Sequence, residues 1–148
     1  MSRTDPKRRR PRTPPAQPVE VSAGLVFRNG KLLVTQRHAD AHLGGLWEFP
    51  GGKRERDESF ESCLVRELRE ELGIEVAVRD LVETVEHDYG DKRVLLKFFR
   101  CELLANEPQA LGCPAFKWIT RKELSSNEFP AADARLIEGL GSSKDFWR

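Results

Sequence analysis

The sequence predicts a single domain built on a mixed β-sheet that is covered by helices, in the α/β or α+β range. Two observations support this fold class. Apolar stretches typical of strands lie before and after one strongly periodic helix, and a second helical pattern follows at residues 131–140. The 148 residues suit one hydrophobic core, and no internal repeat divides them. Residues 19–148 are expected to form the domain, after a tail of residues 1–18.

Two antiparallel strands are predicted at the start of the domain, within residues 19–37. Their apolar stretches are joined by Asn29 and Gly30, a pair that suits the positive φ angles of a tight hairpin turn. The elements expected after the central helix are strands at residues 74–89, 93–104 and 114–119 and a closing helix at residues 131–140.

The central helix is predicted from the spacing of its apolar residues. These recur every four positions, at Phe60, Leu64, Leu68 and Leu72. Ser59 has a side chain suited to cap the first turn, and Gly73 is suited to end the helix. The helix is therefore expected to lie between these two residues with one apolar face.

Charge is distributed unevenly along the chain. Charged residues make up 33% of the sequence, above the roughly 25% usual for globular proteins, yet the formal net charge is only +1. Residues 1–18 hold five prolines and six Lys or Arg against one acid, which predicts a disordered tail. The tail is either a nucleic-acid-binding or targeting patch, or else a solubilising leader or a misassigned start. The remaining residues carry 19 basic and 23 acidic side chains. An anionic ligand would therefore need bound cations or a few well-placed basic groups.

Cysteine content indicates a reducing compartment, and hydropathy indicates a protein without a membrane span. Cys63, Cys101 and Cys113 are odd in number and lack Cys-x-x-Cys spacing, which argues against a disulfide framework or a zinc site. No apolar run approaches the roughly 20 residues that span a bilayer, and the N-terminus lacks the apolar segment of a secretion signal. We expect a cytoplasmic protein with no membrane partner.

Three glutamates gather on one side of the predicted central helix. At about 100° per residue, Glu67, Glu70 and Glu71 fall within about 100° of one another, beside the apolar stripe. Like charges at this spacing destabilise a helix by roughly a few tenths of a kcal/mol. Carboxylates on a rigid element suit Mg²⁺ or Mn²⁺, and Mg²⁺ favours phosphate-bearing partners. The alternative is a solvated acidic face that Arg66 and Arg69 neutralise.

The loop before this helix carries groups that suit a phosphate ligand. Gly51 and Gly52 leave room for a ligand to approach the backbone, and Lys53 adds a positive charge. Glu58 adds a fourth carboxylate near the start of the helix. This combination favours a metal-assisted phosphate site over a solvated acidic face.

These residues form a sequence motif. Gly52 is followed after five residues by Glu58, and after seven more residues comes the segment RELREELGI, residues 66–74. This arrangement resembles the Nudix box, and the stretch TQRHADAHLGGLWEFPGGK, residues 35–53, is similar to the MutT-like branch of the Nudix hydrolases. Together with NEFPAADARLIEGL, the resemblance extends over roughly residues 19 to 142.

The resemblance implies an α/β/α sandwich with a central mixed sheet, and hydrolysis of nucleoside triphosphates to the monophosphate and pyrophosphate with Mg²⁺ or Mn²⁺. It also implies that Arg66 orients the glutamates and that Lys53 touches phosphate. The implied metal ligands are Gly52, Glu67, Glu70 and Glu71, with Glu58 as a less direct helper. The proton acceptor stays open between a helix glutamate and Glu107, in the loop before the strand at residues 114–119.

Five residues are candidates for the nucleoside end of the substrate. Arg37 and Phe49 match positions near the substrate in the MutT-like branch, and Trp47 or Phe129 has a ring that can pack on a base. Asp133 stands where the MutT-like pattern has an asparagine that pairs with the base. Because a carboxylate at neutral pH only accepts hydrogen bonds, the favoured base should present N–H groups, as guanine, 8-oxoguanine and cytosine do.

The resulting hypothesis is an enzyme that removes 8-oxo-dGTP or related nucleotides from the nucleotide pool. A CTP or dCTP pyrophosphohydrolase is an alternative, which Asp133 suits equally well. Two further alternatives involve nucleic acid and the basic tail: hydrolysis at RNA 5′ ends, or a non-catalytic MutT-like nucleic-acid-binding domain. His38, His42 and His87 lack ligand spacing and are expected in surface or structural roles.

Overall fold

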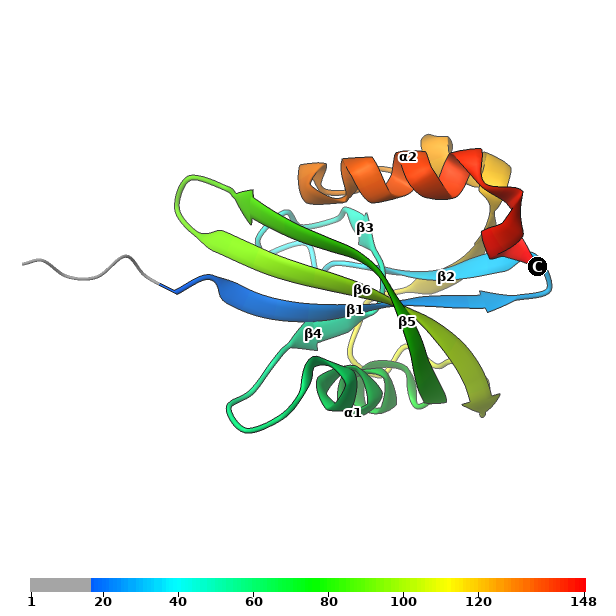
Figure 1. Cartoon of the computed structure of the whole chain (residues 1–148), viewed down its shortest axis with the longest axis horizontal. Coiled ribbons are helices and arrows are strands. Elements are labelled where there is room, and N and C mark those ends of the chain that lie inside the picture. Colours follow the sequence, from blue (N-terminus) through cyan, green and yellow to red (C-terminus); the bar gives the residue numbers. More distant parts are fainter. Residues whose placement is uncertain (1–16) are drawn as a thin grey trace, which may run out of the picture.

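A mixed sheet of seven strands lies between two helices in the computed structural model, which describes residues 17–148 (Figure 1). The strands are β1 (Val19–Arg28), β2 (Lys31–Gln36), β3 (Trp47–Glu48), β4 (Gly51–Lys53), β5 (Glu75–Asp88), β6 (Arg93–Ala105) and β7 (Phe116–Thr120). The helices are α1 (Phe60–Leu72) and α2 (Ala134–Ser142), with 3₁₀ turns η1 (Arg121–Ser126), η2 (Ala131–Asp133) and η3 (Lys144–Trp147). The predicted fold class is confirmed. The tail expected at residues 1–18 lies outside the described residues, except for Gln17 and Pro18.

Strand β1 lies at the centre of the sheet. The strand order is β3-β2-β1-β6-β5, while β4 pairs with β1 and β7 pairs with β2. β1 runs parallel to β6, from Val19 opposite Val94 to Val26 opposite Cys101, whereas the other strand pairs are antiparallel. One edge of β1 pairs with β4 near its start and with β2 at its end. This shared edge holds the short strand β4 against the first half of β1.

The predicted hairpin between β1 and β2 is confirmed. Asn29 and Gly30 have φ angles of 53° and 76°, in the left-handed region that a tight hairpin turn requires. Strands β5 and β6 form a longer antiparallel hairpin whose register shifts on both sides of Leu81. Such irregularities bend a strand and increase its twist, which fits the strong curvature of β5 in Figure 1.

Helix α1 begins and ends as the sequence predicts. The Ser59 side chain accepts a hydrogen bond from the Ser62 backbone N–H at 3.0 Å, which caps the first turn. Gly73 has a φ of 70° and donates its backbone N–H to the Arg69 carbonyl at 2.9 Å, which ends the helix. Leu64 and Leu68 are fully buried, and burial of such side chains stabilises the fold by roughly 1.5–3 kcal/mol each.

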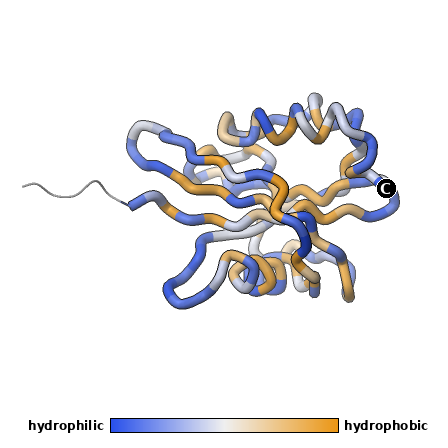
Figure 2. Tube along the Cα trace, viewed as in Figure 1, coloured by the Kyte–Doolittle hydropathy of each residue, from blue (hydrophilic) through white to orange (hydrophobic). Residues whose placement is uncertain are grey.

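The two faces of the sheet carry separate hydrophobic cores. Neighbouring residues on a strand point to opposite faces, so each central strand contributes to both cores. Three adjacent pairs show this division, the first of each pair facing α2 and the second facing α1: Leu25 and Val26, Leu32 and Leu33, Phe98 and Phe99. The resulting mixture of hydrophobic and hydrophilic residues along the chain is visible in Figure 2.

The structure differs from the sequence-based expectation at two places. Strands β3 and β4 were not expected, because two or three residues are too few to show an alternating pattern. The closing helix starts at Ala134 rather than Ala131, because the Asp133 N–H bonds the Pro130 carbonyl at 3.0 Å in a tighter 3₁₀ turn. Within residues 17–148, no helix has the length and apolar character needed to cross a membrane.

Candidate functional site

A cavity of about 250 Å³ lies on the α2 side of the sheet, beside the first half of β1. Apolar residues of β1 and β6 line one part of it: Val19, Val21, Ala23, Val94, Leu96 and Phe98. Polar and charged residues converge on it from several loops: Arg37, His42, Glu48, Lys53, Tyr89, Lys92 and Asp133. A largely apolar cavity with a few convergent polar groups is typical of a small-molecule site.

Strand β4 separates this cavity from helix α1. Gly51 and Gly52 line the cavity with their backbone. A side chain at position 51 would collide with the backbone of β1, and one at position 52 would displace the Glu67 carboxylate. A Cβ atom on Gly51 would lie 1.9 Å from the Ser22 carbonyl oxygen, and one on Gly52 would lie 2.2 Å from Cδ of Glu67. The absence of side chains therefore lets the α1 carboxylates reach the backbone that forms the cavity wall.

Two of the predicted glutamates, Glu67 and Glu71, lie against the β4 backbone where these side chains are absent. Oε1 of Glu71 accepts a hydrogen bond from the Gly51 backbone N–H at 3.3 Å. The Glu67 carboxylate occupies the place where a side chain on Gly52 would lie. Glu70 sits further out, with 62% of its side chain exposed. The helix thus presents two half-buried carboxylates to the wall and a third to solvent.

Arg66 is the counter-charge for most of this acidic group. Its guanidinium lies 2.6 Å from Oε1 of Glu58, 3.0 Å from Oε2 of Glu67 and 3.3 Å from Oε1 of Glu70. It also donates to the Lys53 carbonyl at 3.2 Å, which ties α1 to β4. Arg66 therefore lies where the orienting role implied by the family resemblance would place it, in contact with three carboxylates.

The acidic face is only partly neutralised by these arginines. Arg69 bonds Glu75 at 2.8 Å instead of the cluster, so the alternative in which Arg66 and Arg69 share the neutralisation is wrong for Arg69. Arg66 does pair with Glu67 and with Glu70, as that alternative expects. Glu71 makes no ion pair among residues 17–148, so its charge is the one left uncompensated.

The electrostatic environment gives these carboxylates different pKa values. Burial, followed by the nearby charge of Glu48, raises the pKa of Glu71 to about 8. Burial also raises the pKa of Glu67, against the lowering effect of Arg66. The hydrogen bond from Arg66 lowers the pKa of Glu58 to about 2, so this carboxylate stays ionised and holds Arg66 in place.

The donor chemistry of this region fits a hard divalent cation. Among residues 17–148, no three His, Cys, Asp or Glu side chains already converge as a metal centre. Glu71 nevertheless combines burial with an uncompensated charge, which a cation would relieve. Carboxylates on one rigid helix, beside backbone carbonyls of β4, are the ligand types that Mg²⁺ and Mn²⁺ prefer.

Arg37, predicted near the substrate, organises the opposite side of the cavity. Its guanidinium lies 2.7 Å from Oε1 of Glu48 and donates to the His42 carbonyl at 2.6 Å. Asp133 lines the same cavity and is only 5% exposed. Burial and the charge of Glu48 raise the pKa of Asp133 to about 7, although Arg37 acts in the opposite direction.

This pKa corrects the expectation that Asp133 only accepts hydrogen bonds at neutral pH. Near pH 7 a substantial fraction carries a proton, and a protonated carboxyl group both donates and accepts, as an amide does. The structure therefore places Asp133 on the cavity and changes its expected hydrogen-bonding pattern.

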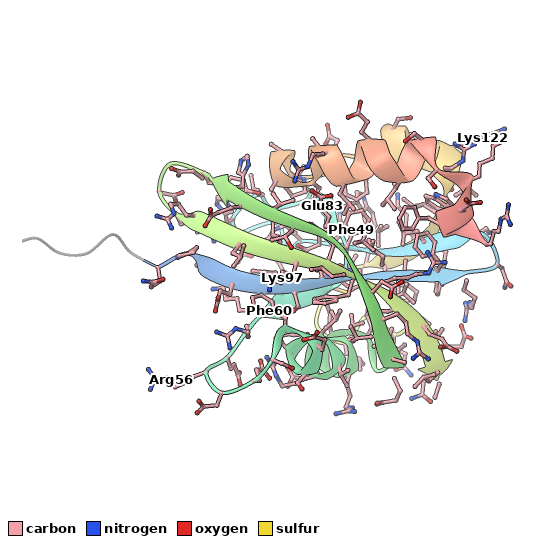
Figure 3. All side chains as sticks on the ribbon, in the orientation of Figure 1. Phe49, Arg56, Phe60, Glu83, Lys97 and Lys122 are labelled. Carbon is pink, nitrogen blue, oxygen red and sulfur yellow. The ribbon has the colours of Figure 1, made fainter. Side chains whose placement is uncertain are left out.

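The candidate aromatic residues separate into one cavity residue and two supporting residues. Phe49 lines the cavity on the α2 side of the sheet (Figure 3). Phe129 stacks behind it, with ring centroids 5.3 Å apart, and Trp47 packs under the Lys117 ammonium at 4.1 Å. Neither Phe129 nor Trp47 lines the cavity, so the idea that one of them packs directly on a base is not supported by the geometry.

Three cavity residues were missed or misassigned from the sequence. Glu48 carries no motif of its own, and only the pairing of β3 with β2 brings it beside Arg37. Tyr89 was expected as the last residue of the strand at residues 74–89, but β5 ends at Asp88, and Tyr89 lines the cavity from the turn between β5 and β6. His42 was expected in a surface or structural role, and the structure places it on the cavity, edge-on against Tyr89 at 5.0 Å. Its buried Nε2 has no hydrogen-bond partner among residues 17–148.

One other candidate, Glu107, lies away from the carboxylates of α1. Glu107, considered as a proton acceptor, is 77% exposed and accepts hydrogen bonds of 2.8 and 3.2 Å from Arg28, so the structure does not support that role.

The three cysteines are buried and carry free thiols. Burial raises the pKa of Cys63 to about 11, so this thiol stays protonated at neutral pH.

The fold and the site together define an α/β/α enzyme in which a carboxylate-bearing helix meets a cavity through a glycine strand. A family model for the NUDIX domain matches residues 22–139, and the chain belongs to this family as a MutT-like Nudix hydrolase. A CTP pyrophosphohydrolase of Escherichia coli K12 is 40% identical over 82% of this chain and 90% of its own length. An 8-oxo-dGTP diphosphatase of the same organism is 33% identical over 82% of this chain and 95% of its own length.

The solved structures agree with this family assignment. A structure from a study of MutT of Aliivibrio salmonicida and Vibrio cholerae aligns with a TM-score of 0.71 and 26% identity, over 84% of this chain and 97% of that one.

Proposed function

We propose that the protein hydrolyses nucleoside triphosphates to the monophosphate and pyrophosphate, in a reaction that depends on Mg²⁺ or Mn²⁺. One observation supports the proposal most directly. Glu67 and Glu71 contact the backbone of β4, which forms one wall of the cavity, and Asp133 also lines that cavity. The relatives named as an 8-oxo-dGTP diphosphatase and a CTP pyrophosphohydrolase support the same reaction type.

The charges of the cavity suit a substrate with a polyphosphate end and a nucleoside end. Lys53 and Lys92 lie on the cavity, and neither forms an ion pair within residues 17–148, so both are available to phosphate oxygens. Arg37 is held by Glu48, which fixes its position at the cavity. Phe49 and Asp133 provide an aromatic ring and a polar group for the base.

The metal would be held by Glu67, Glu70 and Glu71, with a backbone carbonyl of β4. When bound, a divalent cation neutralises phosphate charge and lowers the pKa of a bound water. Glu58 and Arg66 keep the helix carboxylates oriented, and the Gly51 N–H holds Glu71 against the wall. A helix glutamate remains the candidate proton acceptor after Glu107 is set aside.

For the physiological substrate, we propose 8-oxo-dGTP or a related nucleotide, with CTP or dCTP as the second candidate. The second candidate is favoured by the 40% identity with the relative named CTP pyrophosphohydrolase. Asp133 suits either base, because a carboxyl group that titrates near pH 7 can accept from N–H groups and donate to carbonyl oxygens, and guanine, 8-oxoguanine and cytosine present both. The three free, buried thiols fit a reducing compartment, and we place the protein in the cytoplasm.

The test is pyrophosphate release with Mg²⁺ across canonical and oxidised nucleoside triphosphates. We expect hydrolysis of at least one nucleotide with a kcat/KM in the enzymatic range of about 10⁴–10⁸ M⁻¹ s⁻¹, and loss of the reaction in EDTA. A higher kcat/KM for 8-oxo-dGTP than for CTP and dCTP supports the first candidate, and the reverse order supports the second. Release of orthophosphate alone, or no turnover of any nucleotide, would contradict the proposed reaction.

A further inference from the structure

Two small polar residues lie buried under the glycine strand, on the α1 side of the sheet. Ser22 on β1 and Cys63 on α1 are both 0% exposed. Ser22 lies opposite Gly52 in the antiparallel pairing of β1 with β4. Its Oγ donates to the carbonyl of Phe60 at 2.6 Å, which ties the first turn of α1 to the sheet.

Cys63 makes the second connection, from the helix to the glycine strand. Its Sγ donates to the Gly52 carbonyl oxygen at 3.6 Å, which is within range for a sulfur donor. The position of the Gly52 peptide is therefore determined from two sides, by this thiol and by the adjacent carboxylate of Glu67. Both contacts come from α1, one turn apart, since Cys63 and Glu67 are separated by four residues.

From these contacts we propose that Cys63 is a positioning residue: its thiol fixes the Gly52 peptide and thereby the distance between β4 and the carboxylates of α1. The inference rests on the proposed metal-dependent function. A metal site that combines helix carboxylates with a strand carbonyl requires the helix and the strand to keep a constant separation. Ser22 supports the same separation at the start of the helix.

The consequence is measurable without substrate. Partners that orient metal ligands typically change metal affinity by about 10- to 100-fold when they are removed. A thiol is a weak donor, so we expect Cys63→Ala to weaken Mn²⁺ binding at the lower end of this range, by about tenfold. Cys63→Ser keeps a donor and should bind Mn²⁺ more tightly than Cys63→Ala.

The experiment measures free Mn²⁺ by electron paramagnetic resonance in titrations of the full chain, together with thermal unfolding. Cys101→Ala is the matched control, because Cys101 is also buried and its Sγ donates to a carbonyl, that of Phe99, outside the glycine strand. We expect Cys101→Ala to leave Mn²⁺ affinity unchanged. Ser22→Ala provides a second test if Cys63→Ala fails to fold, and it should weaken Mn²⁺ binding in the same direction.

Three outcomes would overturn the inference: wild-type Mn²⁺ affinity in folded Cys63→Ala, an equal loss in Cys101→Ala, or no Mn²⁺ binding by the wild-type chain. The proposed reaction is judged separately from nucleotide hydrolysis by the wild-type protein. Should that protein bind Mn²⁺ yet hydrolyse no nucleotide, the proposed function fails while the role of Cys63 in the metal site stands.

Discussion

The backbone N–H of Gly51 donates to Oε1 of Glu71 over 3.3 Å, so two residues twenty positions apart in the sequence meet at the cavity wall. This hydrogen bond offsets only a small part of the desolvation cost of the Glu71 carboxylate, which is largely removed from water. One amide hydrogen bond contributes roughly 1 kcal/mol net, whereas burial alone raises the pKa of Glu71 and Glu48 raises it further. Glu71 therefore lies in a position where ionisation is costly for the folded protein.

Replacing Glu71 with glutamine should separate activity from stability. The amide keeps an acceptor for the Gly51 N–H but removes the charge that would bind a metal ion. We expect kcat to fall by about 100-fold or more, as removal of a principal electrostatic group does. Without metal, thermal unfolding at pH 8 should show equal or greater stability. The exposed Glu61→Gln serves as control, and near-wild-type turnover by folded Glu71→Gln at saturating Mg²⁺ would rule out this role.

Replacing Glu48 with glutamine should shift two titrations in the same direction. The charge of Glu48 raises the pKa of both Glu71 and Asp133, and its loss also leaves Arg37 without its 2.7 Å partner. Both effects favour the ionised carboxylates, so both pKa values should fall. The measurement is a carboxyl NMR titration of Asp133 without metal. An unchanged titration midpoint would show that Glu48 does not act on this residue.

Asp133→Asn should alter base preference more than maximal rate. The substitution keeps the size of the side chain while replacing a titrating group with a permanent donor and acceptor. A substrate whose hydrogen bonds lose their partner should fall in kcat/KM by roughly 5- to 150-fold, equivalent to about 1–3 kcal/mol. The nucleotide panel measures this effect at pH 6 and pH 8. A uniform factor for every nucleotide would show that Asp133 does not read the base.

The same residue predicts a pH dependence of stability. The pKa of Asp133 is about 7 in the folded protein, compared with an ordinary value of 3.8, so the folded state binds more protons between these values. Its contribution to the free energy of unfolding is therefore fully present below about pH 4 and is lost as pH rises through 7. A tenfold difference in proton affinity between the folded and unfolded states corresponds to about 1.4 kcal/mol, which sets the scale of the loss.

Asp133→Asn should remove this slope and make the protein more stable than wild type at pH 8. The difference should be small or absent at pH 4, where the wild-type carboxyl is protonated. Urea unfolding at the two pH values measures it, with the exposed Asp145→Asn as control. Equal stabilities of Asp133→Asn and wild type at pH 8 would contradict the raised pKa.

Removal of residues 1–18 should leave the chemistry of free nucleotides intact. The cavity and the carboxylate helix are formed within residues 19–148, and Val19 is the first residue that lines the cavity. A variant that starts at Val19 should keep kcat/KM for a free nucleotide within about threefold. The tail should matter only for longer nucleic acids, whose binding to the full chain should weaken with increasing salt in the same buffer. A tenfold loss for a free nucleotide would show that the basic tail contributes to the active site.

Elements with strong local signals were predictable from the sequence. Helix α1 follows from four evenly spaced apolar residues and two caps, and the β1–β2 turn follows from Asn29 and Gly30, because each signal lies within a few residues. The box residues Glu58, Arg66 and Glu67 were predictable for the same reason, since their motif lies in one continuous segment.

The rest of the site depends on contacts between distant segments. Glu48 reaches Arg37 only through the two-residue strand β3. Tyr89 reaches the cavity only because the β5–β6 hairpin pairs beside β1 in the sheet. The protonation of Asp133 near pH 7 depends on its burial and on the charge of Glu48, neither of which a residue letter reveals. The sequence indicates which groups are present, whereas the folded chain determines their pKa values.

The parallel pairing of β1 with β6 has a consequence for the order of folding. Val19 lies opposite Val94, so this edge of β1 has no strand partner until more than seventy further residues have left the ribosome. The β1–β2 hairpin is local and forms on a timescale of about microseconds, but closing the longer loop carries a larger entropic cost. An apolar strand with an unpaired edge is a template for association with other chains. During synthesis, the segment that later lines the cavity therefore stays open to association with other chains until β6 has been made.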